Sequence, residues 1–388
     1  MHINPTGSKA LHACLPEHLY KAFVDSCGLS TGKITFATEG MDKLLQLDVR
    51  ADDPVNSHKS VSRITLRQIL LSGLEDVVHF GKTFTRYFVR DDGKIVAEFT
   101  DGSYASGDVL VGADGGSSRV RHQFLPHAQR IDTGVVGLAG KLILNADNRN
   151  GIAQEFLDGM ALISAPGGLG MFIAAQIFAD ETAAKTGFGG NAIDYEPATG
   201  PFLDNTKSYV MWALSGRRQT WLPNKPAQLL GGDASKHIAQ TAAAGWHKDL
   251  RDLIARTDPA TVSCLPIRTS VPVGPWQTQR ITLLGDAIHS MTPFRGIGAN
   301  VALRDAANLC EALCAANGGE KDLLESIHSY EAQMLRYGFR AVRESLKAME
   351  QTLDDRVIVR SLNRTTFKML QALPPPVKRW IFRRMGEE

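Results

Sequence analysis

The sequence has few cysteines, no long unbroken apolar run and no excess of charge of one sign. Five cysteines in 388 residues, an odd number, argue against a disulfide framework and for a reducing compartment. The longest apolar passage, residues 160–179, is interrupted by Pro166, three glycines and Gln176, so it is too broken to span a bilayer. A formal net charge of +2 gives no reason to expect a nucleic-acid partner. With no signal peptide visible, we expect an ordinary globular protein in the cytoplasm.

A further absence concerns glycine spacing. A chain that binds a dinucleotide on a doubly wound sheet is expected to open with an apolar strand, then G-x-G-x-x-G, a helix, and a strand that ends in an acidic residue. That order occurs nowhere in the sequence, and the glycine clusters at 112–116, 167–170 and 187–190 fail on spacing or context. The first 28 residues instead predict an extended end followed by two helices that separate near Pro16.

The most informative stretch runs from residue 280 to residue 313. A short apolar run at 281–284 predicts a buried strand, which ends at Gly285 and Asp286. A loop with two more glycines follows, and apolar residues at helical spacing begin after Gly298. The predicted order is therefore strand, carboxylate, glycine-rich loop and helix.

This order suits a ligand that carries hydroxyl groups at one end and an electron-rich ring at the other. Backbone N–H groups in the first turn of a helix have no partner within the helix, and the helix dipole adds positive charge there. Gly296 and Gly298 let a flat ring approach the backbone, and Asp286 can accept hydrogen bonds from sugar-type hydroxyls. A flavin nucleotide fits this description. The alternative is an ordinary strand-loop-helix corner that binds nothing.

The segment GDAIHSMTPFRGIGANVALRDAANL resembles the second flavin-binding motif, the GD motif, of class A flavoprotein monooxygenases of the p-hydroxybenzoate and salicylate hydroxylase type. The matching positions are Gly285, Asp286, His289, Pro293, Gly296, Gly298, Asn300 and Asp305. The segment GADGGSSRVR resembles the DG motif of the same family, and without this pairing it would be a strand-to-helix turn of no function. Its matching positions are Gly112, Asp114, Gly115, Ser118, Val120 and Arg121.

The resemblance implies a set of flavin-binding residues. Asp286 is expected to hold the ribityl chain, and Asp114 is expected to bind the cofactor through the DG motif. The amides of Gly298, Ala299 and Asn300 are expected to face the pyrimidine edge of the isoalloxazine.

Two arginines lie in a helix predicted within residues 59–74. From the residues alone, Arg63 and Arg67, one turn apart, would form a solvated basic face. In the resembled family the first arginine of a similar helix reaches the flavin. That position falls on Arg63, with Arg67 as the second choice.

The resemblance covers Ile3 to about Gln351 and implies an α/β fold. It predicts a Rossmann-like FAD-binding domain that is truncated at its N-terminus, interrupted by a mostly antiparallel β-sheet substrate domain, and followed by C-terminal helices. The expected boundaries are 1–130 and 276–350 for the two parts of the FAD-binding domain, 131–275 for the substrate domain and 351–388 for the helical tail. The unit expected to be missing from the start comprises roughly 30 to 50 residues. Its absence reflects either an incomplete gene model, which we favour, or a shortened protein.

The reaction that the resemblance implies is hydroxylation or epoxidation. NAD(P)H reduces FAD, and the reduced flavin with O₂ delivers one oxygen atom to a small, largely apolar substrate, aromatic or polyketide-like, as in secondary metabolism. The cofactor carries the chemistry, so no catalytic side chain is assigned. His289 and Arg295 would lie near the cofactor on this interpretation, but a capping histidine and a surface arginine are the simpler explanations, and we favour them.

Two alternatives from other classes remain open. The first is a flavin reductase or halogenase of related fold, although the W-x-W-x-I-P segment of halogenases is absent. The second is a flavin-free remnant with a binding or regulatory role.

Other residues receive no functional role. Met171, Phe172, Met211 and Trp212 are candidate pocket residues in the predicted substrate domain, but for each of them we favour a place in the core. Cys310 and Cys314, one helical turn apart, are interpreted as buried small apolar residues and not as metal ligands. The basic, aromatic end VKRWIFRRMGEE is expected to cover a neighbouring element or to lie on a membrane surface, and it is too short for firm membrane binding alone.

Overall fold

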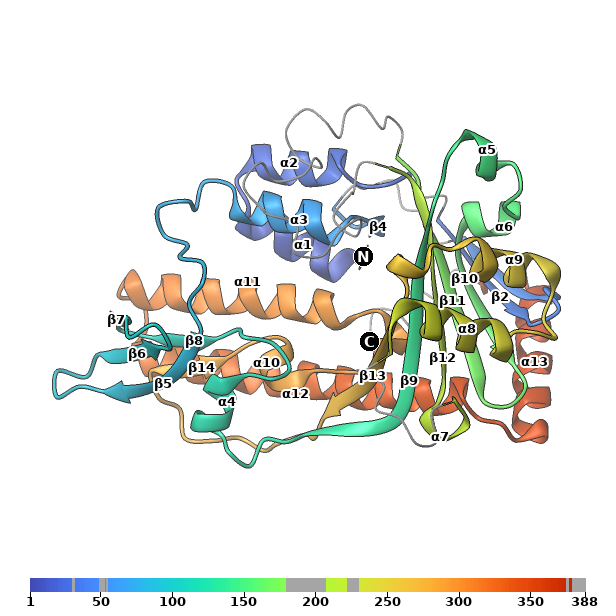
Figure 1. The fold of residues 1–388 in the computed structure, drawn as a ribbon. Helices are drawn as coiled ribbons and strands as arrows, with labels where there is room; N and C mark the ends of the chain where they lie inside the picture. The colour runs from blue at the N-terminus through green and yellow to red at the C-terminus, as the bar shows by residue number, and fades with distance from the viewer. Residues whose placement is uncertain are drawn as a thin grey trace.

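A computed structural model describes residues 1–29, 32–48, 53, 55–178, 207–221, 230–374 and 377–378. The molecule has two parts side by side: a mostly helical part and a part built on a large sheet (Figure 1). In the described residues, none of the helices is both long and apolar enough to cross a bilayer.

The large sheet has seven strands in the order β13-β9-β12-β11-β10-β2-β3, with one parallel pair, β10 with β2. Its strands are β2 (Lys33–Thr38), β3 (Lys43–Asp48), β9 (Arg130–Ile143), β10 (Gly159–Ala165), β11 (Leu169–Gln176), β12 (Tyr209–Arg217) and β13 (Ser263–Ser270). β10 and β11 are paired antiparallel. Two strands from the N-terminal segment, β2 and β3, complete the sheet.

One face of this sheet forms the largest hydrophobic core. Helices α8 (Gly232–Ala242) and α9 (Lys248–Arg256) cover it (Figure 1). The chain turns between the two helices and buries Trp246 in the core. The short elements nearby are α5 (Ala146–Arg149), α6 (Gln154–Leu157), α7 (Arg218–Trp221) and η4 (Pro259–Thr261).

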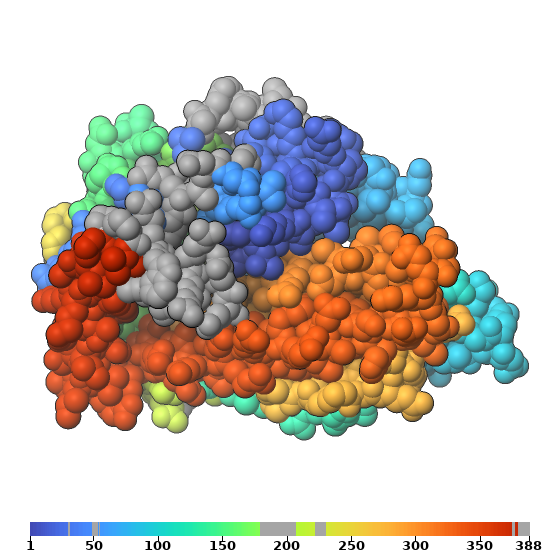
Figure 2. Space-filling view, turned by 180° about the vertical axis from the view of Figure 1, so that it is seen from behind, coloured from blue at the N-terminus to red at the C-terminus, as the bar shows by residue number. Residues whose placement is uncertain are grey.

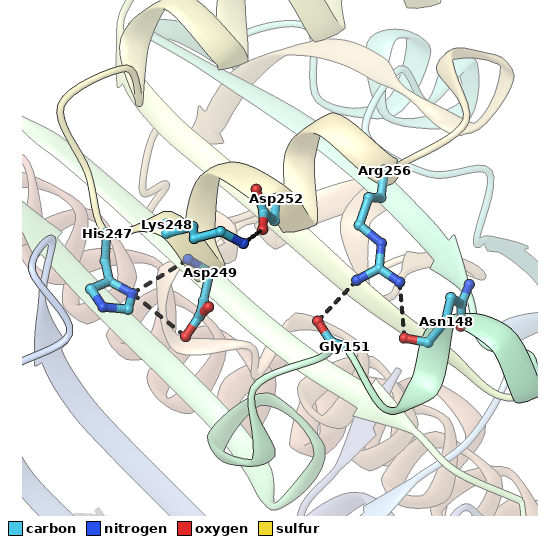
Figure 3. A network of polar contacts seen from close by, with 7 residues as sticks. All are labelled: Asn148, Gly151, His247, Lys248, Asp249, Asp252 and Arg256. Carbon is cyan, nitrogen blue, oxygen red and sulfur yellow. Dashed lines mark hydrogen bonds and ion pairs between the residues drawn. The ribbon is translucent and has the colours of Figure 1, made fainter.

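Polar contacts hold α9 to α5 and to the loop that follows it (Figure 3). The guanidinium of Arg256 donates to the carbonyl oxygens of Asn148 and Gly151, at 2.9 Å each. Within the helix, Lys248 pairs with Asp252 one turn on. These contacts keep one sheet face covered, so that ligands must approach the other face.

The helical part is organised around two short parallel strands, β8 (Leu110–Gly112) and β14 (Ile281–Leu283). A meander of β5 (Phe84–Val89), β6 (Ile95–Phe99) and β7 (Tyr104–Gly107) precedes β8, with turns at Gly93 and Gly102. Helix α4 (Arg119–Phe124) follows β8, while α10 (Asp286–His289), η5 (Pro293–Arg295) and α11 (Gly298–Asn317) follow β14. Apolar residues of both strands, α11 and α12 form a second core.

The N-terminal elements pack on α11 as a third layer (Figure 1). They are β1 (His2–Ile3), α1 (Pro5–Cys14), α2 (Glu17–Asp25), β4 (Lys59–Ser60) and α3 (Arg63–Leu71). The long helix α12 (Leu323–Thr352) runs beneath α11 towards the sheet, and α13 (Val357–Ala372) packs on β3. Seen from behind, α13 lies at the periphery, at the end of the molecule away from the β5–β7 meander (Figure 2).

Candidate functional site

A cavity of about 2590 Å³ lies where the two parts of the molecule meet. One wall is formed by the loop after β14 and the first turn of α11, and a second by the N-terminal segment and the start of α3. The remaining wall is the sheet face that α8 and α9 leave uncovered. The predicted motif and the predicted substrate domain therefore face each other across one space.

The two parallel strands bring the DG and GD motifs to the same edge. Gly112 pairs with Leu283, and a Cβ atom at Gly112 would lie 2.6 Å from the Leu283 side chain, so only glycine allows this approach. Asp286 follows β14, lines the cavity and is exposed to it. The Asp114 carboxylate instead accepts hydrogen bonds from the backbone N–H groups of Arg119, at 2.7 Å, and Val120, at 3.3 Å. Asp114 thus caps α4, while its neighbours in sequence line the cavity.

The first turn of α11 presents backbone donors to the cavity. Gly298 and Ala299 line it, and no described side chain caps this helix end. Gly296 has a φ of +64°, a left-handed conformation that favours glycine, and it turns the chain from η5 into α11. These N–H groups and the positive end of the helix dipole are available to an electron-rich ligand atom.

Asn300 is buried and points away from the cavity. Its Oδ1 accepts from the backbone N–H of Asn4 at 2.8 Å, and its Nδ2 donates to the carbonyl oxygen of His2 at 3.2 Å. Gly7 packs so closely against Asn300 that a Cβ atom there would lie 2.3 Å from Oδ1. The side chain of Asn300 therefore fixes β1 and α1 against α11, and only its backbone lies at the helix end.

The two predicted arginines lie in different surroundings. Arg63 is the first residue of α3 and lines the cavity. The guanidinium carbon of Arg67 lies 5.6 Å from the centre of the Phe80 ring, and Arg67 is not among the cavity residues. Of the pair, Arg63 is the one placed to reach a ligand.

Two connections that sequence reasoning missed hold the strand ends in place. Arg121 is buried and donates to the carbonyl oxygens of Ala287, at 2.7 Å, and Gly116, at 3.1 Å, which joins the DG and GD segments. Burial lowers the pKa of Arg121, and the positive charge of Arg130 lowers it further. Arg121 matches a position of the DG motif, but the spacing of that motif does not show that the Arg121 side chain bonds to the GD segment.

The second connection is a buried pair, His289 with Asp305. His289 is neither a capping residue nor a cavity residue: its Nε2 lies 2.6 Å from Oδ2 of Asp305. The same carboxylate accepts from the backbone N–H of Gly285 at 2.7 Å and from the hydroxyl of Tyr337 at 2.7 Å. Arg295, predicted as a surface residue, lines the cavity and pairs with Glu344.

The open face of the sheet is mostly apolar, with Lys141, Tyr209 and Ser215 also on it. Side chains two residues apart on a strand share a face, and the register aligns alternate residues of four strands on the cavity side. These cavity residues are Ile34, Phe36, Met160, Leu162, Phe172, Met211 and Ala213. Trp212 faces the other way, is fully buried and donates its ring N–H to Thr257 at 2.9 Å. Of the four candidates named from sequence, Phe172 and Met211 lie on this face, Met171 is buried but touches the cavity, and Trp212 is core.

The interpretation of Cys310 and Cys314 as buried residues is wrong. Both are exposed on α11, and the end of α1 brings Cys14 into hydrogen-bonding contact with Cys310. Cys14 and Cys310 are far apart in the sequence, so the sequence did not show that they are neighbours. In the part of the chain that the structure describes, no group of three or more His, Cys, Asp or Glu side chains is arranged to hold a metal ion.

Comparison with known proteins identifies the family. A family model described as an FAD binding domain matches residues 73–345. A dual O-methyltransferase/FAD-dependent monooxygenase, elcB, of Phaeosphaeria nodorum is 30% identical over 352 residues, which cover 83% of this chain and 36% of the relative. The chain spans about a third of the length of this relative and of two similar ones.

Solved structures show the same fold. A protein of Photorhabdus luminescens, provisionally assigned as an FAD-containing monooxygenase, is 31% identical with a TM-score of 0.78 and covers 91% of this chain and 87% of its own. HpxO of Klebsiella pneumoniae, complexed with FAD and uric acid, has a TM-score of 0.73 at 22% identity, with 95% of this chain and 83% of its own covered. Both motifs lie within the residues that the family model matches. The chain therefore belongs to the class A FAD-dependent monooxygenases, with the predicted α/β FAD-binding fold.

Proposed function

We propose that this protein binds FAD in the cavity and uses NAD(P)H and O₂ to hydroxylate or epoxidise a small, largely apolar substrate. The observation that carries the proposal is the position of the first turn of α11. Its uncapped N–H groups lie at a cavity that the mostly apolar sheet face also lines. A ring held at the helix end would therefore have its substrate-binding wall in front of it.

The residues present fit a flavin. Asp286, exposed in the cavity, can accept hydrogen bonds from the hydroxyls of the ribityl chain. The backbone amides of Gly298 and Ala299 can donate hydrogen bonds to the electron-rich edge of the ring. Gly298 has no Cβ atom, and one built there would have only the Met291 side chain near it, at 3.5 Å. Arg63 supplies a positive charge from the opposite wall. When bound and reduced, the flavin supplies the chemistry that activates O₂.

The chain's own task is to orient the ring, exclude water and position the substrate. The N-terminal end of a helix stabilises negative charge on a ring that has taken up electrons. Its N–H groups already point at the ring, so they need not reorient when the charge develops. The apolar side chains of Phe172, Met211 and Leu162 can bury a flat hydrocarbon surface and keep water away from it. An aromatic or polyketide-like substrate satisfies this wall, because it offers flat apolar area with few groups that need hydrogen bonds.

Two measurements on the 388-residue chain test the proposal. The first is titration with FAD and, as a probe of the ring and ribityl chain alone, with FMN, followed by quenching of flavin fluorescence. We expect saturable binding of both. The second is turnover with NADH or NADPH and isotopically labelled O₂ against a panel of phenols, naphthols and aromatic polyketides. We expect labelled oxygen in a product.

Three outcomes would contradict parts of the proposal. A chain that binds neither flavin would be a flavin-free member of its family. NAD(P)H consumption that yields only hydrogen peroxide with every substrate would indicate a reductase or oxidase. Flavin binding that is unaffected by changes at Asp286 and at the start of α11 would place the cofactor elsewhere.

A further inference from the structure

Helix α13 carries an exposed apolar stripe. Ile358, Leu362 and Met369 are 82%, 65% and 67% exposed. Their spacing of four and seven residues places them on one side of the helix, with Thr365 between them. Isolated exposed leucines are common on protein surfaces, but an aligned set along a whole helix is not expected at random.

The opposite side of α13 is firmly attached to the protein. The ring of Phe367 packs on that of Phe36 with centroids 4.8 Å apart, and Arg364 pairs with Glu39 at 2.6 Å. The Oε1 atom of Gln371 accepts from the backbone N–H of Gln46 at 2.9 Å. The helix is therefore held in a fixed orientation at the periphery of the molecule (Figures 1 and 2), and its apolar stripe is exposed.

The charge on this helix is of one sign. α13 contains Arg360, Arg364 and Lys368 but no Asp or Glu. Arg360 and Arg364 are half-buried on the attached side, where Arg364 pairs with Glu39, and Lys368 is exposed on the flank of the stripe. In the sequence, acidic residues are absent from 357 to 386. Basic residues in that stretch are Arg360, Arg364, Lys368, Lys378, Arg379, Arg383 and Arg384.

We propose that α13 is an interfacial helix that docks this protein on a bilayer containing anionic lipids. An exposed apolar stripe flanked by Lys368, in a stretch of chain that has basic but no acidic residues, lets a helix insert its apolar side chains below the headgroups while nearby cations meet lipid phosphates and carboxylates. Nucleic acid would use the basic residues but not the stripe. A protein partner would need a surface shaped to fit a convex helix, whereas a lipid surface adapts to it.

The position of α13 also matters for the cavity. Phe36, under the helix, lines the cavity, and so do Thr352 before the helix and Lys378 after it. Docking through α13 therefore brings the edge of the cavity close to the bilayer, where apolar substrates partition. This consequence, unlike the docking itself, rests on the proposed function.

Vesicle sedimentation with the full 388-residue chain tests the docking. Vesicles of phosphatidylcholine with roughly one third phosphatidylserine should bind the protein, and pure phosphatidylcholine vesicles should bind it much more weakly. Because surface charge is screened by salt, binding should fall at high ionic strength. The triple variant Ile358→Ser, Leu362→Ser, Met369→Ser should bind about a hundredfold more weakly, and Lys368→Gln about fivefold more weakly.

A matched control comes from the far end of the molecule. Val89 and Tyr104 are also exposed, on the β5–β7 meander, so Val89→Ser, Tyr104→Ser should leave vesicle binding unchanged. All variants change exposed residues, and unchanged melting temperatures would confirm that they fold. The proposal is overturned by absent binding, by equal binding to both vesicles, or by a concentration-dependent dimer that the triple variant abolishes while vesicle binding is unaffected. The last result would make the stripe an interface between two copies of the chain.

Discussion

The imidazole Nε2 of His289 lies 2.6 Å from Oδ2 of Asp305, and both side chains are buried. Through the other bonds of Asp305, this pair joins the end of β14 at Gly285 to Tyr337 in α12. Gly338 lies against the imidazole, where a Cβ atom would be 2.7 Å from Cδ2. The carboxylate of Asp305 in α11 thus holds together the end of β14, helix α10 and helix α12.

Replacing that carboxylate should destabilise the fold. Asp305→Ala leaves a buried histidine, a tyrosine hydroxyl and a backbone N–H without their acceptor, so we expect a loss of about 3–5 kcal/mol in the free energy of unfolding. Urea denaturation measures this loss. Asp322→Ala, which removes only the exposed cap of α12, should cost about 1 kcal/mol. Equal effects of the two changes would show that the buried network is not special.

The pair also predicts a pH dependence. Burial, the largest cause, lowers the pKa of His289, but the hydrogen bond and negative charge of Asp305 outweigh it, so the pKa in the folded protein is raised. A histidine with a raised folded pKa contributes stability that is complete below its unfolded value of about 6.5 and is lost as the pH rises through the folded value. The free energy of unfolding should therefore decrease above about pH 6.5. In His289→Gln this decrease should be absent; if it persists, another group causes it.

Asp286 should matter for flavin affinity and little for stability. It is exposed in the cavity, and a charge-assisted hydrogen bond contributes roughly 1.5–3 kcal/mol, so Asp286→Ala should weaken FAD binding about ten- to a hundredfold. Fluorescence titration measures the change. Asp233→Ala, at the start of α8 on the covered side of the sheet, is the matched control and should bind FAD normally. Unchanged affinity in Asp286→Ala would remove this residue from the site.

Neighbouring residues on β12 should separate binding from stability. Met211 faces the cavity, so Met211→Ser should reduce the affinity for an apolar aromatic ligand about tenfold while leaving the melting temperature nearly unchanged. Trp212 fills the core on the opposite face, so Trp212→Ala should lower the free energy of unfolding by about 3–5 kcal/mol. Ligand titration and thermal unfolding of both variants test the assignment. A reversed pattern would mean that the sheet presents its other face to the ligand.

The local parts of the site could be predicted from sequence. The strand, carboxylate, glycine loop and helix of residues 280–313 are present in the predicted order, because apolar spacing and glycine positions determine each of them within a few residues. What the sequence did not show is contacts between distant segments. The contact of Cys14 with Cys310, the bond from Arg121 to Ala287 and the inward turn of Asn300 towards Asn4 each join separate parts of the chain.

The same limit explains why strand pairing was only partly foreseen. The strands of residues 33–48 complete the large sheet, although they precede its other members by a long stretch of chain. Alternation of apolar residues shows that a segment is a strand, but it does not show which partner the strand will find. The side of the sheet on which Phe172, Met211 and Trp212 lie follows only from that pairing.

The parallel pairing of β8 with β14 has a consequence for how the protein acquires its structure. Everything from Ala113 to Arg280 lies between the two strands, so they can meet only after this intervening chain has compacted enough to bring its ends together. Contacts between such distant residues make folding slow. The sheet, with its covering helices, is expected to form early. The strand ends that carry Asp114 and Asp286 and the first turn of α11 are expected to assemble last. During synthesis the ribosome must therefore release residue 281 and beyond before any ligand can be held at this edge.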